Sequence, residues 1–205
     1  MSFIKTIRSY FIHLILALAF SLCCSTVSVA KSSPKTQYRT PEGYWLAYAK
    51  GPDGKQYKRS IMHLTIDNNK GVNNPVMNGV LDTTFFIPGK NWSSRCVNCQ
   101  GPFKDKRVLG LKILTGLEPS SQPIKSDTQW VGGTVYNLDA NRFFSLSVQQ
   151  TKAGKELRVK GCLPNLSFAC KTFTWYRITS TKQLQQLQQE GLMQLKTIKP
   201  QFATS

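Results

Sequence analysis

The sequence predicts an all-β fold: an eight-stranded antiparallel up-and-down β-barrel followed by a C-terminal α-helix. Apolar and polar residues alternate with a period of two over most of the chain from Gly43 to Thr179, and short turn sequences separate the later alternating segments. After Ser180 the apolar spacing becomes helical. Closing eight strands into a barrel removes exposed sheet edges and leaves room for one small ligand.

Length and composition fit a single folded domain of ordinary size. The chain has 205 residues, of which 40% are hydrophobic and 11% aromatic, and this content excludes a disordered chain. Its glycines and prolines show no period, which excludes a collagen-like protein. The formal net charge of +17 indicates contact with something anionic, although charge says nothing about the fold.

Residues 1–30 are expected to be a signal peptide. Lys5 and Arg8 precede an apolar run of about 15 residues, shorter than the roughly 20 that a membrane-spanning helix needs. Small residues at Ser28 and Ala30 suit cleavage after Ala30. An uncleaved membrane anchor is the alternative. We therefore expect export through the general secretory route to the periplasm or the outside of the cell.

Cleavage would leave a strongly basic chain that begins at Lys31. Only Lys5 and Arg8 lie in the first 30 residues, so 25 of the 27 basic residues remain against 10 acidic ones, a net charge of +15. These residues are dispersed, and most are expected to lie on a solvated surface. Residues 31–42 are polar and flanked by proline, which indicates a flexible lead before the barrel.

The barrel domain is predicted to span residues 43–179. Its eight candidate strands are Gly43–Tyr48, Ile61–Asp67, Val80–Ile87, Val108–Leu117, Gln129–Leu138, Phe143–Gln149, Glu156–Leu163 and Thr172–Thr179. The connection Pro88–Arg107 is long enough to be functional or mobile.

The last segment, residues 180–205, is expected to form a helix and tail. Ser180 can cap the helix, and Gly191 weakens it. We expect its apolar stripe to pack on the barrel wall rather than on a partner, and it consists of Leu184, Leu187, Leu192 and Leu195.

Alternation along the strands also predicts which side chains point into the barrel. Such positions fill the floor near the closed end, and they can touch a ligand near the mouth. The pocket candidates are Trp45, Met62, Leu64, Leu109, Leu111, Phe144, Leu146, Leu157 and Val159.

Two motifs at opposite ends of the pattern resemble the lipocalin arrangement. Gly43-x-Trp45 opens the first strand, and Trp175-x-Arg177 lies on the last. A large ring fills the tapered base of the barrel, and a planar guanidinium covers its face while donating to backbone carbonyls. The resemblance implies that Trp45, Trp175 and Arg177 close the barrel floor.

A closer resemblance covers Gly43 to Ile178. The chain is similar to the exported bacterial family catalogued as domain of unknown function 2147, which implies a lipocalin-like barrel and a ligand-binding role with no activity to carry over. The matching pieces are Gly43-Tyr-Trp45, Cys96-Val-Asn-Cys99-Gln-Gly101, Gly110-Leu-Lys-Ile-Leu114, Trp130-Val-Gly-Gly133-Thr-Val-Tyr136, Leu157-Arg-Val-Lys-Gly161 and Trp175-Tyr-Arg177. The chain departs from the family in residues 71–79, in its basicity and in its glutamine-rich C-terminal helix.

Four cysteines follow the expected cleavage site, as Cys96-x2-Cys99 and Cys162-x7-Cys170. Four cysteines allow three connectivities. A hairpin would bring Cys162 close to Cys170, and an exported protein favours oxidation, so we expect structural Cys96–Cys99 and Cys162–Cys170 bridges. Two alternatives remain, a redox dithiol at Cys96 and Cys99 and a zinc site built from all four.

Enzyme chemistry finds little support in the sequence. His63 is the only histidine after the expected cleavage site, and alternation places it on the outer face of its strand. No Gly-x-Ser-x-Gly motif is present, and no pair of carboxylates indicates acid–base work. We expect no cofactor, no metal and no nucleic-acid partner.

Two hypotheses for function follow. In the first, the protein is a non-enzymatic carrier that binds a small apolar or amphipathic ligand inside the barrel. In the second, it is a basic envelope-associated module that binds anionic lipid or polysaccharide, because a net charge of +15 is high for a plain carrier. A thiol-disulfide role at Cys96 and Cys99 ranks below both.

Overall fold

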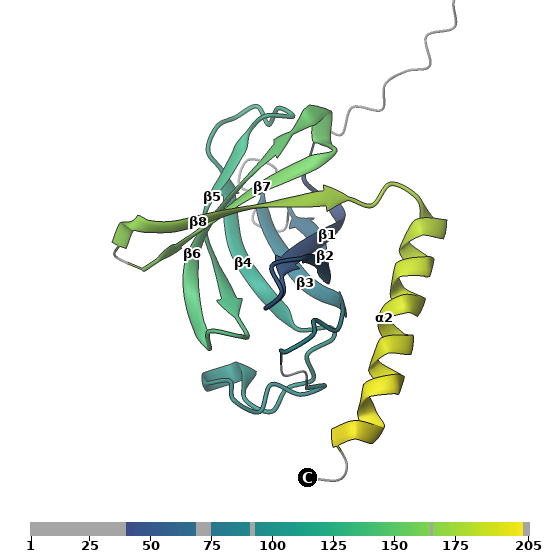
Figure 1. Ribbon diagram of the computed structural model, residues 1–205. Coiled ribbons are helices and arrows are strands. Elements are labelled where there is room, and N and C mark those ends of the chain that lie inside the picture. The colour runs from purple at the N-terminus through teal and green to yellow at the C-terminus, as the bar shows by residue number, and fades with distance from the viewer. Residues whose placement is uncertain (1–39, 69–74, 91–92, 165, 203–205) are drawn as a thin grey trace, which may run out of the picture. The chain divides into compact units, whose positions relative to one another are not determined.

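A computed structural model shows an eight-stranded antiparallel barrel followed by one long helix, and the predicted fold class is confirmed (Figure 1). The structure describes residues 40–68, 75–90, 93–164 and 166–202. The expected signal peptide, residues 1–30, lies outside this part of the chain. Among the described residues, no helix is both long and apolar enough to cross a membrane.

The strands pair in sequential order, and the last strand returns to the first. They are β1 (Gly43–Lys50), β2 (Gln56–Asp67), β3 (Val76–Thr84), β4 (Lys112–Pro119), β5 (Gln129–Asn137), β6 (Arg142–Thr151), β7 (Glu156–Leu163) and β8 (Leu166–Arg177). Two short 3-10 turns, η2 (Gly101–Phe103) and η3 (Lys152–Gly154), lie in the connections, and α2 (Thr181–Phe202) ends the described chain.

Sequential pairing gives the barrel two distinct ends. The floor end carries the start of β1, the end of β8 and the connections β2–β3, β4–β5 and β6–β7. The loop end carries the connections β1–β2, β3–β4, β5–β6 and β7–β8. The longest described connection, between β3 and β4, is at the loop end.

The barrel interior is the main hydrophobic core. Alternate residues of successive strands meet there, as a period of two requires. Its fully buried side chains include Trp45, Met62, Leu64, Met77, Leu114, Leu117, Trp130, Tyr136, Val148 and Leu157.

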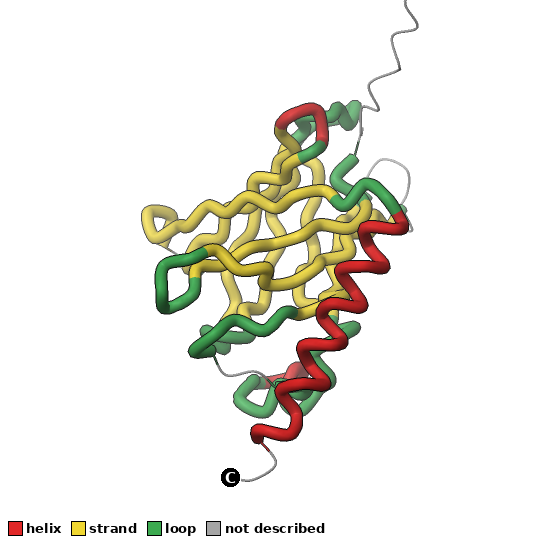
Figure 2. The backbone as a smooth tube through the Cα atoms, turned by 45° about the vertical axis from the view of Figure 1, so that its right-hand side comes forward, coloured by secondary structure: helices red, strands yellow, loops and turns green. Residues whose placement is uncertain are grey.

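Helix α2 packs on the outer face of β1, β2 and β3, as predicted, and Figure 2 shows it lying lengthwise along the barrel wall. Ser180 caps the helix, because its Oγ accepts a hydrogen bond from the Gln183 N–H at 3.1 Å. Leu187 is buried in a second apolar cluster with Leu46 and Ile61. Polar helix side chains add contacts to the barrel, including a 2.6 Å ion pair between Lys58 and Glu190.

One expectation about the helix is wrong. Leu192 is 52% exposed and does not belong to the packed stripe. Gly191 faces the barrel instead, and an added Cβ there would lie 2.5 Å from Thr83 Cγ2 and 3.1 Å from the Thr84 carbonyl oxygen. Gly191 therefore allows α2 to lie close to the barrel, whatever it costs in helix propensity.

Strand β4 begins four residues later than the alternation predicts. Gly110 has φ of +84°, a left-handed conformation that glycine adopts readily, and the chain turns there before it enters the sheet. Leu109 and Leu111 consequently lie in the connection before β4 and are half-buried. The inner face of β4 carries Leu114 and Leu117 instead.

Other strand bounds shift by a few residues. Strand β3 runs from Val76 to Thr84 rather than from Val80 to Ile87, and β8 begins six residues earlier than predicted. Strand β2 begins five residues earlier, at Gln56.

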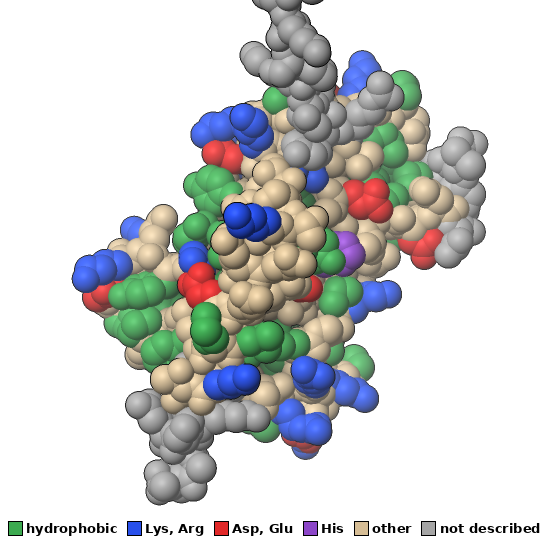
Figure 3. All heavy atoms as spheres, turned by 90° about the vertical axis from the view of Figure 1, so that its right-hand side faces the viewer, with side chains coloured by type: hydrophobic (Ala, Val, Ile, Leu, Met, Phe, Trp, Pro, Cys, Tyr) green, Lys and Arg blue, Asp and Glu red, His purple; other side chains and the backbone are tan. Residues whose placement is uncertain are grey.

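Basic side chains are dispersed over the face that α2 covers, and Figure 3 shows them scattered there.

Candidate functional site

The floor is closed by one stacked pair. The Arg177 guanidinium carbon lies 4.2 Å from the centroid of the Trp45 ring. The same guanidinium donates to the carbonyl oxygens of Gly154 at 2.7 Å, Glu42 at 2.5 Å and Thr40 at 2.9 Å. One planar fork thus ties β8 to the β6–β7 turn and to the segment before β1.

Residues 40–42 belong to the floor, although they were expected to end a flexible lead. The Trp45 Nε1–H donates to the Pro41 carbonyl oxygen at 2.7 Å, and Pro41 is fully buried. The Gln150 side-chain amide donates to the Thr40 carbonyl oxygen at 3.0 Å. Trp175 lies two residues before Arg177, half-buried against the main core.

The interior is filled to contact on the side of β2 to β5. Gly79 and Gly133 face inward there, beside the core leucines of neighbouring strands. An added Cβ would lie 2.8 Å from Leu64 Cδ2 at Gly79 and 2.5 Å from Leu117 Cγ at Gly133. Neither position has room for a further methyl group, because the neighbouring leucines already fill the space in front of both glycines.

The seam between β1 and β8 that closes the barrel is short. Strand β1 pairs with β8 only from Trp45 to Ala47, opposite Arg177 to Trp175. A register shift between Ala47 and Tyr48 follows, and β1 then continues along β2. Among the described residues, no strand pairs with this edge of β8 before Trp175, which leaves an opening in the strand pairing there, although the inner residues Leu146, Val148, Leu157 and Val159 of β6 and β7 remain buried.

An apolar surface with one cation lines this opening. Gly161 of β7 lies opposite the core residue Leu146 on one side and Lys171 on the other, and Phe173 lies opposite the buried Val159. These pairings place Gly161, Lys171 and Phe173 on the inner face. Phe173 is nevertheless 47% exposed.

Gly161 marks the free space directly. An added Cβ there would find, among the described residues beyond its chain neighbours, only Phe144 Cβ, 3.9 Å away. Phe144 lies two residues before Leu146 on β6, so it is on the same face of the strand, and it is half-buried. We call Phe144, Gly161, Lys171 and Phe173 the inner opening. This opening can receive an apolar body beside two aromatic rings and a polar end near Lys171.

The loop end is covered by residues 93–111, here called the lid. The lid folds on itself, because the Cys96 N–H donates to the Lys106 carbonyl oxygen and the Val108 N–H donates to that of Ser94. Cys96, Cys99 and Val108 are buried in the main core. The lid therefore plugs the end of the barrel where a ligand would otherwise enter.

An aromatic cluster holds the lid on β5. The Phe103 ring stacks on the Tyr136 ring with centroids 4.2 Å apart, and Phe143 meets the Tyr136 ring edge-on. The Tyr136 hydroxyl accepts a hydrogen bond from the Gln100 N–H at 3.0 Å and donates to the Asn141 side chain. These contacts link the lid to the β5–β6 turn.

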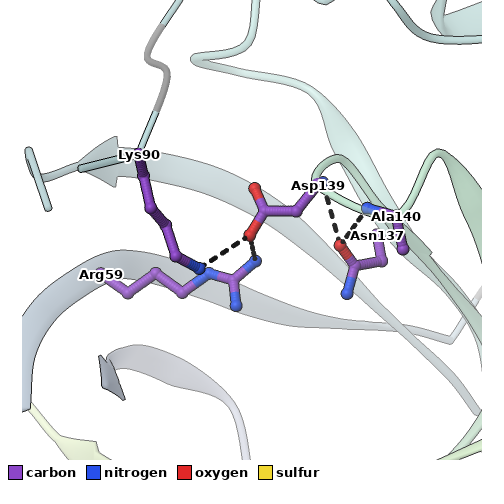
Figure 4. Close-up of polar contacts among 5 residues, drawn as sticks. All are labelled: Arg59, Lys90, Asn137, Asp139 and Ala140. Carbon is purple, nitrogen blue, oxygen red and sulfur yellow. Dashed lines mark hydrogen bonds and ion pairs between the residues drawn. The ribbon is translucent and has the colours of Figure 1, made fainter. Parts of the chain in front are cut away.

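Two basic side chains from other parts of the loop end form ion pairs with the β5–β6 turn. Arg59 of β2 and Lys90 of the β3–β4 connection converge on Asp139, at 3.0 Å and 3.4 Å (Figure 4). The turn itself is shaped by Asn137, whose side-chain oxygen accepts from the N–H groups of Asp139 and Ala140. All three charged side chains are partly exposed, so the pairs contribute little stability individually.

The cysteines form the two expected pairs, Cys96–Cys99 and Cys162–Cys170. Cys96 is 7% exposed and Cys99 4%, both within the main core. Thiol–disulfide exchange needs an accessible sulfur and a stabilised thiolate, and a buried apolar setting supplies neither. The geometry thus favours a structural role for Cys96 and Cys99. A zinc site built from all four cysteines is wrong, because they are joined in separate pairs.

Two side chains at turns have a raised pKa. The Tyr57 hydroxyl donates to the Asp53 carboxylate at 2.8 Å, and this hydrogen bond raises the pKa of the phenol. Lys152 donates to Glu156 at 2.8 Å, which raises the pKa of the ammonium. Both pairs are exposed and stabilise their turns.

The remaining polar candidates do not gather into a chemical centre. His63 faces outward as expected, and its ring stacks on that of Tyr44 with centroids 4.1 Å apart. Among the described residues, no three side chains of the types that bind metals lie together.

The pocket candidates from the sequence fall into three groups. Six are buried in the main core and hold the barrel together, namely Trp45, Met62, Leu64, Leu146, Leu157 and Val159. Leu109 and Leu111 lie in the connection before β4, so they are not inward-facing strand residues. Phe144 alone reaches the inner opening. Sequence reasoning missed Gly161, Lys171 and Phe173, because only the cross-strand register places them there.

Comparisons with known proteins agree with the fold. The family model described as "Uncharacterized protein conserved in bacteria (DUF2147)" matches residues 35–177. A solved structure from Helicobacter pylori, protein HP1028, is described as belonging to the lipocalin family. It is 16% identical, with a TM-score of 0.50, and the match covers 76% of this chain and 97% of that one. No curated protein matches the sequence.

Proposed function

Since this chain belongs to the bacterial family of domain of unknown function 2147 and has a lipocalin-like barrel, we propose that it binds a small apolar or amphipathic ligand at the inner opening. Barrels of eight strands are just wide enough to hold one small molecule. The proposed ligand lies between β6, β7 and β8, with its apolar part against Phe144 and Phe173.

This proposal rests on one observation, the different amounts of free space in front of three inward-facing glycines. Side chains press on Gly79 and Gly133, whereas Gly161 has open space in front of it. Lys171, opposite Gly161, offers a cation to the polar end of a bound molecule. An amphipathic ligand with an acidic end, such as a fatty acid, matches this combination.

A filling substitution tests the proposal. In Gly161→Leu the new side chain occupies the opening, and the backbone accepts it because φ at this position is not left-handed. We expect a dansyl-labelled fatty acid to bind the wild type and to bind Gly161→Leu about tenfold more weakly or worse. The matched control is Thr172→Leu, which adds the same side chain to the outer face of β8 and should change the affinity less than twofold.

Two results would contradict the proposal. One is absence of binding by the wild type across fatty acids, fatty alcohols and lysophospholipids. The other is an equal loss of affinity in Gly161→Leu and Thr172→Leu. A further variant, Lys171→Gln, tests whether Lys171 contacts the polar end of the ligand. It should weaken the binding of a fatty acid but not the binding of the corresponding fatty alcohol.

We also propose that the protein binds its ligand outside the cytoplasm. Its support is the charge and length pattern of residues 1–30 together with two disulfides, which persist in oxidising compartments. Fractionation of cells followed by N-terminal sequencing tests it. The expected result is a periplasmic or secreted chain that begins at Lys31, and a full-length cytoplasmic chain would contradict it.

A further inference from the structure

The hairpin formed by β7 and β8 exposes apolar side chains toward its tip. Leu163 pairs with Leu166 while Cys162 pairs with Cys170, so the three residues 167–169 form a bulge without partners on β7. Phe168 lies in this bulge and is 86% exposed, and Leu166 is 40% exposed. Exposed apolar side chains grouped at one end of a protein typically mark an interaction surface.

A disulfide fixes the shape of this hairpin. Cys162 and Cys170 are directly opposite each other and covalently bonded, two residues from Phe168 along β8. The bridge restricts how far the two strands can separate next to the bulge, where no described strand pairs with the other edge of β8. Docking through Phe168 would therefore cost little ordering entropy.

A shallow groove of about 500 Å³ crosses the outer face of the sheet from β5 and β6 to this hairpin. Cations and uncharged polar groups line it, and the lining holds no carboxylate. The lining residues are Gln129, Ser147, Val148, Gln149, Arg158, Lys160 and Thr172. Arg158 and Lys160 are both exposed, and their charges, with the amide and hydroxyl donors around them, suit the phosphate of an anionic headgroup.

The surrounding charge agrees with an anionic partner. Residues 142–175 contain six basic side chains and a single acidic one, Glu156, which is already bonded to Lys152. A free polysaccharide would satisfy the cations but would leave Phe168 and Leu166 in water. A bilayer offers headgroup phosphates and an apolar interface at the same surface.

We propose that the β7–β8 hairpin docks the protein on an anionic phospholipid bilayer. Arg158 and Lys160 bind headgroup phosphates, and Phe168 and Leu166 enter the interface. This surface is distinct from the inner opening, which lies on the other face of the hairpin. A protein held in this way presents the opening beside the membrane, where amphipathic molecules are concentrated.

Vesicle flotation with the chain that begins at Lys31, the expected product of cleavage, tests the docking surface. The wild type should bind vesicles of phosphatidylcholine with about one-third phosphatidylglycerol at low salt, and binding should fall as salt rises. Phe168→Gln should weaken binding about tenfold. The matched control is Leu192→Gln, which removes an exposed apolar side chain from α2 and should leave binding within twofold.

A pair of charge variants isolates the groove. Arg158→Gln/Lys160→Gln should weaken binding to anionic vesicles about 25-fold, because each basic residue held at an anionic surface contributes about fivefold. Lys125→Gln/Lys182→Gln removes the same net charge from exposed positions outside the hairpin. This control should lose no more than a few-fold.

Three outcomes would overturn the proposal. The first is absent binding to anionic vesicles at low salt, or equal binding to pure phosphatidylcholine. The second is that Phe168→Gln or Arg158→Gln/Lys160→Gln weakens vesicle binding no more than its matched control does. The third is a dimer, seen by sedimentation velocity, that Phe168→Gln dissolves, since a second copy would then cover the β8 edge. Gly161→Leu separates the two proposals, because it should weaken fatty-acid binding about tenfold or more and leave flotation unchanged.

Discussion

Replacing Arg177 by methionine tests whether the floor is held by the guanidinium. Methionine keeps most of the length and the apolar stem, but removes every donor. Three carbonyl oxygens, of Thr40, Glu42 and Gly154, then lose a charged donor, and the Trp45 ring loses its cation. A hydrogen bond to a charged group contributes about 1.5–3 kcal/mol and a cation–π contact about 0.5–2 kcal/mol.

These contributions overlap, because one guanidinium makes all of them and is itself only half-buried. We expect the free energy of unfolding to fall by about 3–5 kcal/mol, a large share of the usual 5–15 kcal/mol. The melting temperature should fall by about 10–15 °C at this chain length. Arg177→Lys should retain part of the stability, since an ammonium cannot match the planar fork.

Urea denaturation followed by circular dichroism measures the effect. The control is Arg142→Met, because Arg142 is exposed and makes only a long 3.4 Å hydrogen bond from Nε to the Ala140 carbonyl oxygen. That control should lose less than about 0.5 kcal/mol. A loss below about 1 kcal/mol in Arg177→Met, or equal losses in both variants, would refute the role assigned to the floor.

Three further predictions concern α2, the lid and the loop end. Gly191→Ala should lower the free energy of unfolding by about 1–2 kcal/mol, despite alanine's higher helix propensity, because the new Cβ would meet Thr83 at 2.5 Å; a stabilised variant in urea denaturation would contradict this contact. Cys96→Ser/Cys99→Ser should lower the melting temperature, and the wild type should show no turnover in an insulin-reduction assay. Turnover lost in the double variant would instead favour the redox hypothesis. Asp139→Asn should cost less than about 1 kcal/mol, and the cost should vanish in about 1 M salt; a larger, salt-independent cost would mean that the ion pairs are effectively buried.

The fold was predictable because its main determinant is local. A period of two over successive short segments identifies antiparallel strands, and short turns then favour sequential pairing. The prediction of β4 failed because single glycines interrupt the period there. Gly110 and Gly116 both have left-handed φ, so β4 starts late and its inward residues differ from those the alternation predicts. Backbone geometry of this kind has no hydropathy signature.

The floor and the inner opening differ in how far the sequence could reveal them. Trp45 and Arg177 sit in short motifs at the two ends of the barrel, and their chemistry indicates a stacked pair. Gly161 and Phe173 carry no such motif. Their importance arises from register across β6, β7 and β8 and from the shortness of the β1–β8 seam. A pairing between the first and last strands joins residues more than 120 positions apart in the sequence.

The lid and the seam together determine how a ligand would reach the interior. In an up-and-down barrel the mouth is the usual binding site. Here Cys96, Cys99 and Val108 fill the mouth from above, and Phe103 stacks on Tyr136 beside them. The proposed inner opening instead meets solvent beside the seam, where Phe173 is 47% exposed and β1 leaves β8 after three pairs of residues. Access from the side requires no movement of the lid, so a disulfide there can stabilise the barrel without obstructing binding.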